Sequence, residues 1–428
     1  MKKLLLLLFT FIGITVLNTE SLQAQLSVSK TSSKDAAILN KSRPQEPKAI
    51  PVPTFVIKTK NNDFMCTIGG VMNPIMGVDL GGELYKTDAG ISFIPGDIPL
   101  TKVRGQRNDY YINPLNGALD FQFVGFAGTK NEITAYMKIQ TTGTTPMLGF
   151  SRVYLTWKGF TMGQKLTMFQ DLYACQPPTI DPQGPCGDIS NVAYEISYQS
   201  KSYSGFRFSI GLDMPTYYTS NGMYRGKDFP SFTDSKVIAD ANEMIPDIPM
   251  WIEYQKSPSN RIRLSGIIRN FQYVDLVKNR QRGLVGWGTM ISGNFSFWKP
   301  LTFNVQAAYG KGIGSYLQDI AGRPVSYIPK DDEPGKMKAS PMMGLVFGFS
   351  YNATSKLQFN AIASQSRIWQ TATYYKDYKY TQYYCGNVFY NLTPYLQWGL
   401  EYIYGKKQAW DPVSNYNHRI QSQLMFTF

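Results

Sequence analysis

The chain ends in His418-Arg419-Ile420-Gln421-Ser422-Gln423-Leu424-Met425-Phe426-Thr427-Phe428, in which apolar and polar residues alternate up to a terminal aromatic residue. Alternation with a period of two is typical of a strand that shows one face to an apolar environment and the other to water. A soluble protein gains little from a frayed hydrophobic terminus, whereas a membrane barrel must pair its last strand with its first. The ending therefore predicts the closing strand of an outer-membrane β-barrel, and we expect Phe426 and Phe428 to form the signal that the barrel-assembly machinery recognises.

The amino-terminal residues have the pattern of a secretory signal peptide. Lys2-Lys3 precedes an apolar run from Leu4 to Leu17, and small residues follow up to Ala24, so residues 1–24 are expected to be a leader that is removed. As a transmembrane helix the run would fall short of the roughly 20 apolar residues that a bilayer core requires. Residues 25–53 are rich in Ser, Lys and Pro and are expected to form an extended periplasmic linker without a core.

The composition is rich in aromatic residues without being strongly apolar. The chain has 29 Tyr, 25 Phe and 7 Trp, which make up 14% of it, while its mean hydropathy is only -0.25. This combination suits a barrel with aromatic girdles at the two membrane interfaces. A large secreted β-sandwich or β-propeller would have a similar composition, so the spacing of strands and loops must distinguish these folds.

Segments of about ten residues with period-two alternation recur from Phe64 to the end, and we count sixteen. The predicted strands span 64–72, 118–126, 132–140, 150–158, 163–170, 192–200, 205–212, 248–256, 261–270, 286–297, 301–310, 341–352, 356–369, 380–391, 395–405 and 417–428. Short turns such as 257–260 alternate with long loops such as 213–247, which is typical of membrane barrels and not of sandwiches or propellers.

The predicted fold is therefore an all-β transmembrane antiparallel barrel over residues 54–428, with short periplasmic turns and long outer loops. Both termini are expected in the periplasm, because this phase of turns and loops holds along the whole chain. Thr54 to Lys60 could add a further strand, which leaves the strand count open by two.

The same parity places more basic than acidic residues on the inward face. The inward bases are Lys138, Arg152, Lys158, Lys165, Arg207, Arg261, Arg263, Arg269 and Arg419, and the inward acids are Asp120, Glu132, Glu195, Glu253 and Glu401. Positive charge in a narrow pore of low dielectric favours anions. The net charge of +13 fits small anionic solutes, lipopolysaccharide or anionic membrane lipid as partners, and an exported basic protein is not expected to meet nucleic acid.

Three arginines of one predicted strand, Arg261, Arg263 and Arg269, form the densest basic cluster. Because guanidinium groups bind carboxylates and phosphates bidentately, these residues are candidates for selecting solutes. The alternative is that they pair with lumenal carboxylates such as Glu253 on the preceding strand and simply stabilise the barrel wall. The sequence leaves both roles open.

The third outer loop, residues 171–191, contains Cys175 and Cys186. Their position in one loop of an exported chain predicts a disulfide that would stiffen the loop by roughly 2 to 4 kcal/mol. A metal site would require more soft ligands at metal-binding spacing. Cys66 and Cys385 lie on strands far apart in order and are expected to be free.

The chain contains a single histidine, His418, at the mouth-side end of the last strand. A Ser-His-Asp triad and a histidine-rich metal site are therefore nearly excluded, and no carboxylate dyad is evident. We predict that the protein is not an enzyme and that it has no metal or other cofactor.

One strand and the loop after it carry a family pattern. They read Lys158-Gly159-Phe160-Thr161-Met162-Gly163-Gln164-Lys165-Leu166-Thr167-Met168-Phe169-Gln170-Asp171 and, further on, Pro178-Thr179-Ile180-Asp181-Pro182-Gln183-Gly184-Pro185. This resembles DcaP-like outer-membrane porins, in which a strand with Gly-Gln and Phe-x-Asp leads into a loop with Pro-Thr-x-Asp-x-x-Gly-Pro. The segments 263–269, 309–319 and 399–402 are similar to the family as well.

The resemblance implies a homotrimeric, sixteen-stranded porin whose third loop folds inward and narrows a channel that passes dicarboxylates and other small anions. By position, Arg152, Arg207, Arg261, Arg263 and Arg269 would line that channel. Lys138 and Lys165 complete the predicted pore lining. The chain departs from the pattern in its short linker, where some members carry a longer helical segment, and in its cysteine pair.

Two function classes therefore remain. One is an outer-membrane porin that favours small anions, and the other is a structural barrel that acts as a scaffold within a larger envelope complex. The inward arginines favour the porin, and electrical conductance would discriminate between the two.

Overall fold

The computed structural model describes residues 26–30, 39, 55–59, 63–81, 92–101, 108–114, 116–142, 147–172, 177–219, 222–225, 237–240, 245–257, 259–371 and 375–428. The predicted signal peptide, residues 1–24, lies outside these ranges, as does most of the predicted linker. Within them, no helix has the length and apolar character needed to cross a lipid bilayer.

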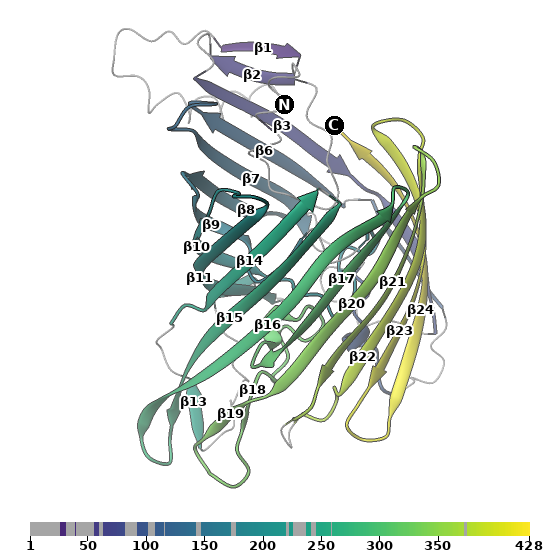
Figure 1. The fold of residues 1–428 in the computed structure, drawn as a ribbon. Helices are drawn as coiled ribbons and strands as arrows, with labels where there is room; N and C mark the ends of the chain where they lie inside the picture. The colour runs from purple at the N-terminus through teal and green to yellow at the C-terminus, as the bar shows by residue number, and fades with distance from the viewer. Residues whose placement is uncertain are drawn as a thin grey trace.

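Sixteen antiparallel strands form a closed barrel in which each strand pairs with the next along the chain (Figure 1). They are β3 (Phe64–Met72), β6 (Gly117–Gly125), β7 (Ile133–Thr142), β8 (Met147–Trp157), β9 (Phe160–Leu166), β10 (Val192–Gln199), β11 (Phe206–Thr219), β14 (Ile248–Ser257), β15 (Asn260–Asp275), β16 (Arg280–Trp298), β17 (Leu301–Lys311), β20 (Pro341–Asn352), β21 (Leu357–Ile368), β22 (Tyr380–Asn391), β23 (Leu396–Gln408) and β24 (Ser414–Thr427). Each corresponds to one predicted strand, so the predicted fold class is confirmed.

The last strand closes the barrel on the first. Phe426 of β24 lies opposite Met72 of β3, and the backbones of Gly70 and Phe428 exchange two hydrogen bonds of 2.9 and 3.1 Å. Beyond the break at Asn73-Pro74, β4 (Ile75–Leu80) continues along β24 and pairs with β5 (Asp109–Asn113), which leads into β6. The seam is thus formed by two interrupted strands, one made of β3 and β4 and the other of β5 and β6. The first is interrupted at Pro74, because a proline lacks the N–H that an unbroken ladder requires.

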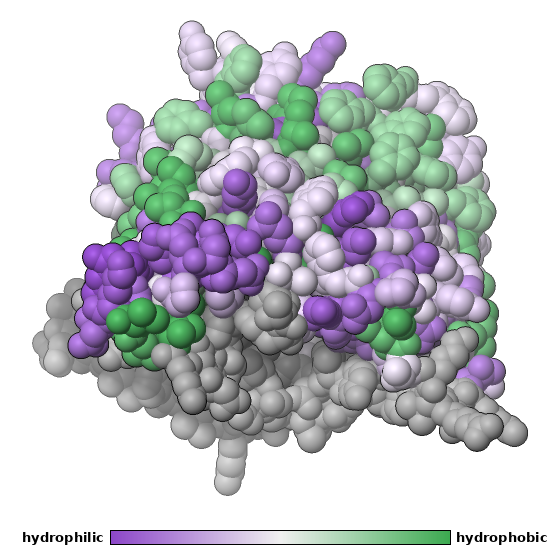
Figure 2. Space-filling model, turned by 90° about the horizontal axis from the view of Figure 1, so that it is seen from below, coloured by the Kyte–Doolittle hydropathy of each residue, from purple (hydrophilic) through white to green (hydrophobic). Residues whose placement is uncertain are grey.

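Alternation of side chains along the strands separates the two faces of the wall. On β15, Arg261, Arg263 and Arg269 are buried inside the barrel, whereas Leu264 is 56% exposed on the outside. Exposed apolar side chains are stable here because lipid, and not water, surrounds the wall. Seen from the end with the long loops, hydrophilic residues gather on the near face and hydrophobic residues along much of the outer margin (Figure 2).

Loops fold into the barrel and bury an apolar core inside it. Residues 312–340 carry the short helix η2 (Gly314–Tyr316) and the hairpin of β18 (Tyr327–Pro329) and β19 (Met337–Ala339). Their side chains pack with the third loop on inward residues of β15–β17 and β20–β21; the core residues include Phe169, Ile189, Ile267, Met290, Ala308, Ile313, Tyr316, Leu317, Ile320, Val325, Met342 and Ile368. Inward positions are therefore apolar on this side of the barrel, where a loop covers them.

The first long loop adds to this filling. Its segment 92–101, with the short helix η1 (Pro95–Asp97), places Phe93 and Ile98 against inward residues of β20–β23. The Gly96 N–H donates to Asp319 Oδ1 at 2.8 Å. The first long loop is therefore bonded, inside the barrel, to the loop of residues 312–340, which is the sixth outer loop in chain order and is called the sixth long loop below.

Two described parts of the predicted 25–53 linker contact the barrel. β1 (Leu26–Lys30) forms an antiparallel ribbon with β2 (Phe55–Thr59), which pairs with β3 at Ile57 and Lys58. Leu39 is buried, and its carbonyl accepts a 2.9 Å hydrogen bond from Gln122 Nε2. The strand considered possible at 54–60 thus exists, but it lies on the edge of β3 and does not join the ring of sixteen. In Figure 1 this ribbon lies at the same end as the carboxyl terminus.

At the opposite end, the hairpin of β15 and β16 projects further than the sequence predicts. It extends to Asp275 and Arg280 and turns through Asn279, which has a positive φ of 46°. β13 (Ile238–Asp240) pairs with its tip, and β12 (Gly222–Arg225) pairs with the end of β11. The long loops therefore supply strands of their own, which extends the wall beyond the predicted ends of 270 and 286.

We predict that Gly70→Val weakens barrel closure. A Cβ at Gly70 would lie 2.7 Å from the Phe428 ring and 2.9 Å from the Ala118 carbonyl oxygen, and crowding of this kind costs about 1 to 3 kcal/mol. The folded fraction, measured as the heat-modifiable band in gel electrophoresis, should fall. Gly386→Val is the matched control, since a Cβ there meets nothing within 4 Å; equal loss in both variants would contradict the proposed role of the seam.

Candidate channel lumen

Glu253 is the centre of a buried cluster of charges on the inner wall. The register places it opposite Arg207 of β11 and Arg263 of β15. Its carboxylate accepts hydrogen bonds from Arg207, from Arg261 and from Arg263, whose Nη2 lies 2.7 Å from Oε2. The Glu253 side chain has no exposed surface, and that of Arg261 is 2% exposed. Three predicted pore residues therefore share one carboxylate.

Asp171 ties this cluster to the third loop. Arg261 Nη2 lies 2.5 Å from Asp171 Oδ1, and the Ser292 hydroxyl donates to Oδ2 at 2.5 Å. Arg263 stacks its guanidinium over the Trp251 ring at 4.2 Å. Since a buried guanidinium needs both a counter-charge and hydrogen-bond partners, these contacts favour the alternative in which Arg261 and Arg263 stabilise the wall.

The other deeply buried arginines are paired as well. Arg269 Nε lies 2.9 Å from Asp247 Oδ2, which also accepts from the Tyr316 hydroxyl at 3.0 Å. Arg419 forms a bidentate pair with Asp79, with distances of 2.7 and 2.8 Å. Arg269 is thus embedded between β15 and the loop core, with no exposed surface.

The third loop crosses the barrel to the opposite wall. The N–H groups of Ile180 and Asp181 donate to the two oxygens of Glu401 on β23 at 2.8 and 2.9 Å. Further along, the Gly187 N–H donates to Ser364 Oγ on β21 at 2.8 Å. A Cβ at Gly344 would lie 2.2 Å from the Gly187 carbonyl oxygen, so the loop backbone touches β20 directly. Residues 177–191 of the loop lie inside the barrel.

Inward basic residues on the remaining wall are only partly buried. Lys138 of β7 and Arg152 of β8 lie opposite one another in register and are half-buried. Lys165 of β9, whose side chain is 26% exposed, pairs with Glu195 at 3.0 Å, and Arg207 of β11 is 15% exposed. The structure therefore divides the predicted pore lining into a buried group and a half-buried group on β7–β11.

Two residues that the parity rule placed on the inward face lie elsewhere. Lys158 occupies the turn between β8 and β9 with a positive φ of 50°, and its ammonium group lies 4.6 Å above the Trp157 ring. Glu132 precedes β7, and its carboxylate accepts a 2.7 Å hydrogen bond from the Gly128 N–H. β8 ends one residue earlier than predicted and β7 begins one residue later. The alternation of inward and outward faces therefore does not extend to Lys158 or Glu132.

The predicted disulfide is not seen. Cys186 is a free, buried cysteine, and its Sγ lies 3.6 Å from Ser364 Oγ; its expected partner, Cys175, lies outside the described residues. Burial raises the pKa of Cys186 to about 12, so this thiol is protonated at neutral pH. Cys66 and Cys385 are free, as expected. Across the described ranges, no group of three or more His, Cys, Asp and Glu side chains is placed to hold a metal ion.

Sequence reasoning missed the acidic partners that come from loops. Asp247 and Asp319 lie in segments without periodicity, so no parity rule assigns them a face. Asp171 and Asp181 did stand in the family pattern, which was a signal that they position the third loop. Glu401 was assigned inward correctly, but its role as acceptor for the loop backbone has no sequence signature.

Comparison with solved structures identifies this fold among outer-membrane proteins. The outer membrane channel DcaP of Acinetobacter baumannii has a TM-score of 0.70 at 16% identity, covering 87% of this chain and 99% of that one. OmpT of Vibrio cholerae has a TM-score of 0.52 at 9% identity, and OmpF of Salmonella typhi 0.51 at 7%; each match covers 86% of this chain and 99% of the other. The resemblance to DcaP-like porins is thus confirmed at the level of the fold.

Sequence comparison adds nothing to this. No protein-family model matches the chain, and no curated protein sequence matches it.

We predict that Glu253→Gln destabilises the barrel by about 3 to 5 kcal/mol, because it removes the charge that compensates buried arginines. Urea unfolding followed by tryptophan fluorescence would measure the loss. Glu333→Gln is the control, since Glu333 also bridges two cations, Lys330 and Lys336, but with side chains about one-third exposed. A loss as large in the control as in Glu253→Gln would show that burial does not set the cost.

A second prediction concerns Asp181 in the third loop. Burial raises its pKa to about 7, Glu401 adds to the shift, and hydrogen bonding from the Phe93 N–H and the charge of Arg419 oppose it. The folded state therefore keeps a proton that the unfolded chain loses near pH 4, so this group's contribution to stability falls as pH rises from about 4 to 7.

The unfolding free energy of Asp181→Asn minus that of wild type should therefore increase as the pH rises from about 4 to 7, by at most about 1.4 kcal/mol per pH unit. Above about pH 8 the difference should be constant. A difference that is flat from pH 4 to 8 would contradict the assignment.

Proposed function

We propose that this chain is a porin of the outer membrane of a Gram-negative-type cell, a diffusion channel with both termini on the periplasmic side after removal of residues 1–24. The observation that carries the proposal is the closed sixteen-stranded barrel with apolar side chains outside and charged side chains inside. The outer membrane channel DcaP has a similar fold, and the inward charges supply the polar lining that solutes require.

The proposed aqueous path follows the wall of β7–β11. The opposite side of the interior is occupied by the apolar core of the first, third and sixth long loops. On the β7–β11 side, Lys138, Arg152 and Lys165 are half-buried and charged, whereas Glu195 and Ser197 on β10 are buried. Ions avoid the apolar core because dehydration is costly there, so the half-buried wall is the route that water favours.

We propose that the channel favours small anions such as dicarboxylates. Lys138, Arg152 and Lys165 lie on the neighbouring strands β7, β8 and β9, and their potential raises the local concentration of anions. Arg207 lies further along the wall, on β11. The buried pairs of Arg261, Arg263 and Arg269 hold the wall in place. Lipopolysaccharide and membrane lipid would surround the barrel, and a homotrimer is proposed from the resemblance to DcaP-like porins.

A structural scaffold is the second candidate. The observation that favours it is the extent of the buried loop core, since a barrel with a closely packed interior leaves little space for a pore. A scaffold would keep its fold and its partners without passing current.

Conductance decides between the two. Purified protein in planar bilayers should give discrete single-channel steps, and the reversal potential in a KCl gradient should show chloride preference that succinate reduces. Absence of current from correctly folded protein would overturn the porin and favour the scaffold. Current with a cation preference would retain the porin and overturn anion selectivity.

We predict that the double change Lys138→Glu and Arg152→Glu lowers the chloride-to-potassium permeability ratio several-fold, because it reverses two charges on the proposed path. Lys356→Glu, on an exposed short turn between β20 and β21, serves as the charge-matched control. An unchanged ratio in the double variant, with native heat-modifiability, would place the path elsewhere in the barrel.

A further inference from the structure

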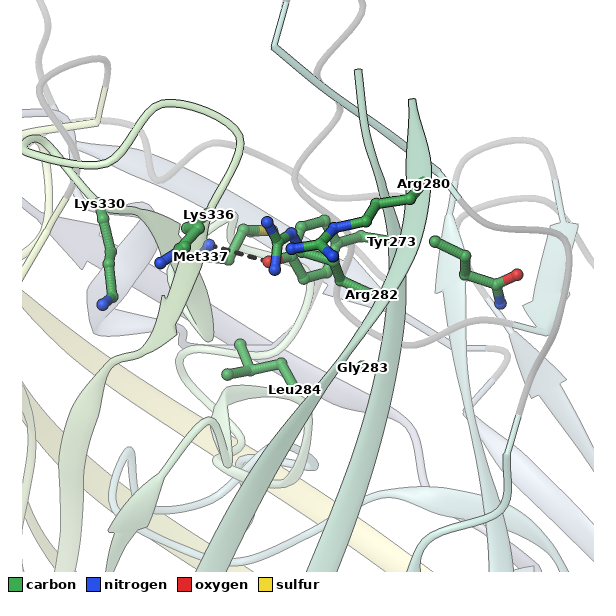
Figure 3. A pocket seen from close by; sticks show the side chains of 9 residues that line it. Tyr273, Arg280, Arg282, Gly283, Leu284, Lys330, Lys336 and Met337 are labelled. Carbon is green, nitrogen blue, oxygen red and sulfur yellow. Dashed lines mark hydrogen bonds between the residues drawn. The ribbon is translucent and has the colours of Figure 1, made fainter. Parts of the chain in front are cut away.

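A basic pocket lies at the end of the barrel that carries the long loops. It is formed between the projecting hairpin of β15 and β16 and the loop from Lys330 to Met337, and it has a volume of about 560 Å³. Arg280 and Arg282 extend from β16 toward the loop that carries Lys330 and Lys336 (Figure 3). Four cationic side chains from two separate elements therefore surround one cavity, which we call the mouth pocket.

The positive charge of the mouth pocket exceeds the negative charge bound to it. Arg282 Nε lies 2.7 Å from Asp275, and Lys330 and Lys336 share Glu333, with 2.5 Å from Lys330 Nζ to Oε1. Two carboxylates thus compensate four cations. Asp331 and Asp332 are exposed on the same loop and do not line the cavity, although the charge of Asp332 also acts on Lys330.

Two of the guanidinium groups keep donors available. Arg282 Nη2 is buried and has no hydrogen-bond partner among the described residues. Arg280 is exposed at the start of β16, where no ion pair holds it within the described ranges. Burying a donor without a hydrogen-bond partner destabilises the folded state. An anion that accepts a hydrogen bond from Arg282 Nη2 would remove this destabilisation.

The walls of the mouth pocket are fixed by packing and by backbone contacts. The Met337 N–H donates to the Tyr273 hydroxyl at 3.2 Å, and Phe271 stacks on Tyr327 at 4.1 Å between centroids. Gly335 has a φ of 80°, and a Cβ there would lie 2.1 Å from Asp275 Oδ1. The loop can therefore approach the hairpin only with glycine at this position, and the four cations are held close before any ligand binds.

We propose that the mouth pocket binds a phosphoryl group carried by a small solute or by lipopolysaccharide. A phosphate dianion matches the net charge of the lining, and its oxygens accept from several guanidinium and ammonium groups at once. The volume exceeds that of a single phosphate and falls in the range of small-molecule sites. Leu284 and Met337 supply an apolar side for the rest of the ligand.

The test uses inorganic pyrophosphate and the full chain purified in detergent free of lipopolysaccharide. Isothermal titration calorimetry at low salt should show saturable binding, and Arg280→Ala with Lys336→Ala should weaken it at least tenfold. Lys356→Ala, at the other end of the barrel, should bind as wild type does. Heat-modifiability confirms that each variant is folded, so a failure of binding is not a failure of folding.

Two results would overturn the proposal: no saturable binding by wild type, or equal binding by wild type and the double variant. A competition arm then identifies the source of the phosphoryl group. Displacement of pyrophosphate by purified lipopolysaccharide in wild type, but not by its dephosphorylated form, assigns the pocket to the lipid; no displacement assigns it to a free solute. Binding in detergent is independent of conductance, so this proposal and the porin function can fail separately.

Discussion

The structure depends on one constraint: within a bilayer every backbone N–H and C=O must be bonded inside the protein. An open sheet of sixteen strands would leave two unpaired edges in lipid, so the ends of the sheet must meet. They meet at the paired backbones of Gly70 and Phe428 and along β4 and β24. Once the ring is closed, alternation fixes which side chains face lipid and which face the interior. The charged side chains of β15, Arg261, Arg263 and Arg269, therefore lie inside the barrel.

Burying those charges sets the second requirement. A guanidinium group taken out of water loses its hydration, and the loss is offset only by a nearby carboxylate with good hydrogen-bond geometry. Glu253 on β14 meets this requirement for residues on both neighbouring strands, and Asp171 and Asp247 meet it from loops. The loops are therefore electrostatic partners of the wall as well as fillers of the space it encloses. The same arginines therefore orient the third loop and have little side-chain surface exposed to the barrel interior.

The strands could be predicted from sequence because period-two alternation is local and the bilayer enforces it in every strand. β15 shows this well: its parity placed Arg261, Arg263 and Arg269 inside, and they are inside. The loops could not be predicted, because the partners of Asp181 and Gly187 lie roughly 200 residues away in sequence and follow no period. The apolar inward positions Ile267 and Met290 break the polar pattern for the same reason, since what covers them comes from 312–340. Period-two alternation thus predicted the wall and most of the inward charges, with Lys158 and Glu132 as exceptions at strand ends. The packing of loops inside the barrel follows no such period.

The ribbon of β1 and β2 covers part of an open strand edge on β3. β24 ends at Thr427, opposite Val71, so the part of β3 near Met65 and Cys66 extends past its neighbour. An exposed strand edge is a template for the edge of another chain, and sheet proteins that leave one uncovered tend to aggregate. β2 pairs with β3 at that place, and Leu39 packs with Met65 of β3 and Val124 of β6. β2 therefore covers an edge of β3 that would otherwise be open to pairing with the edge of another chain, and the short strand β1 forms the outer margin of that cover.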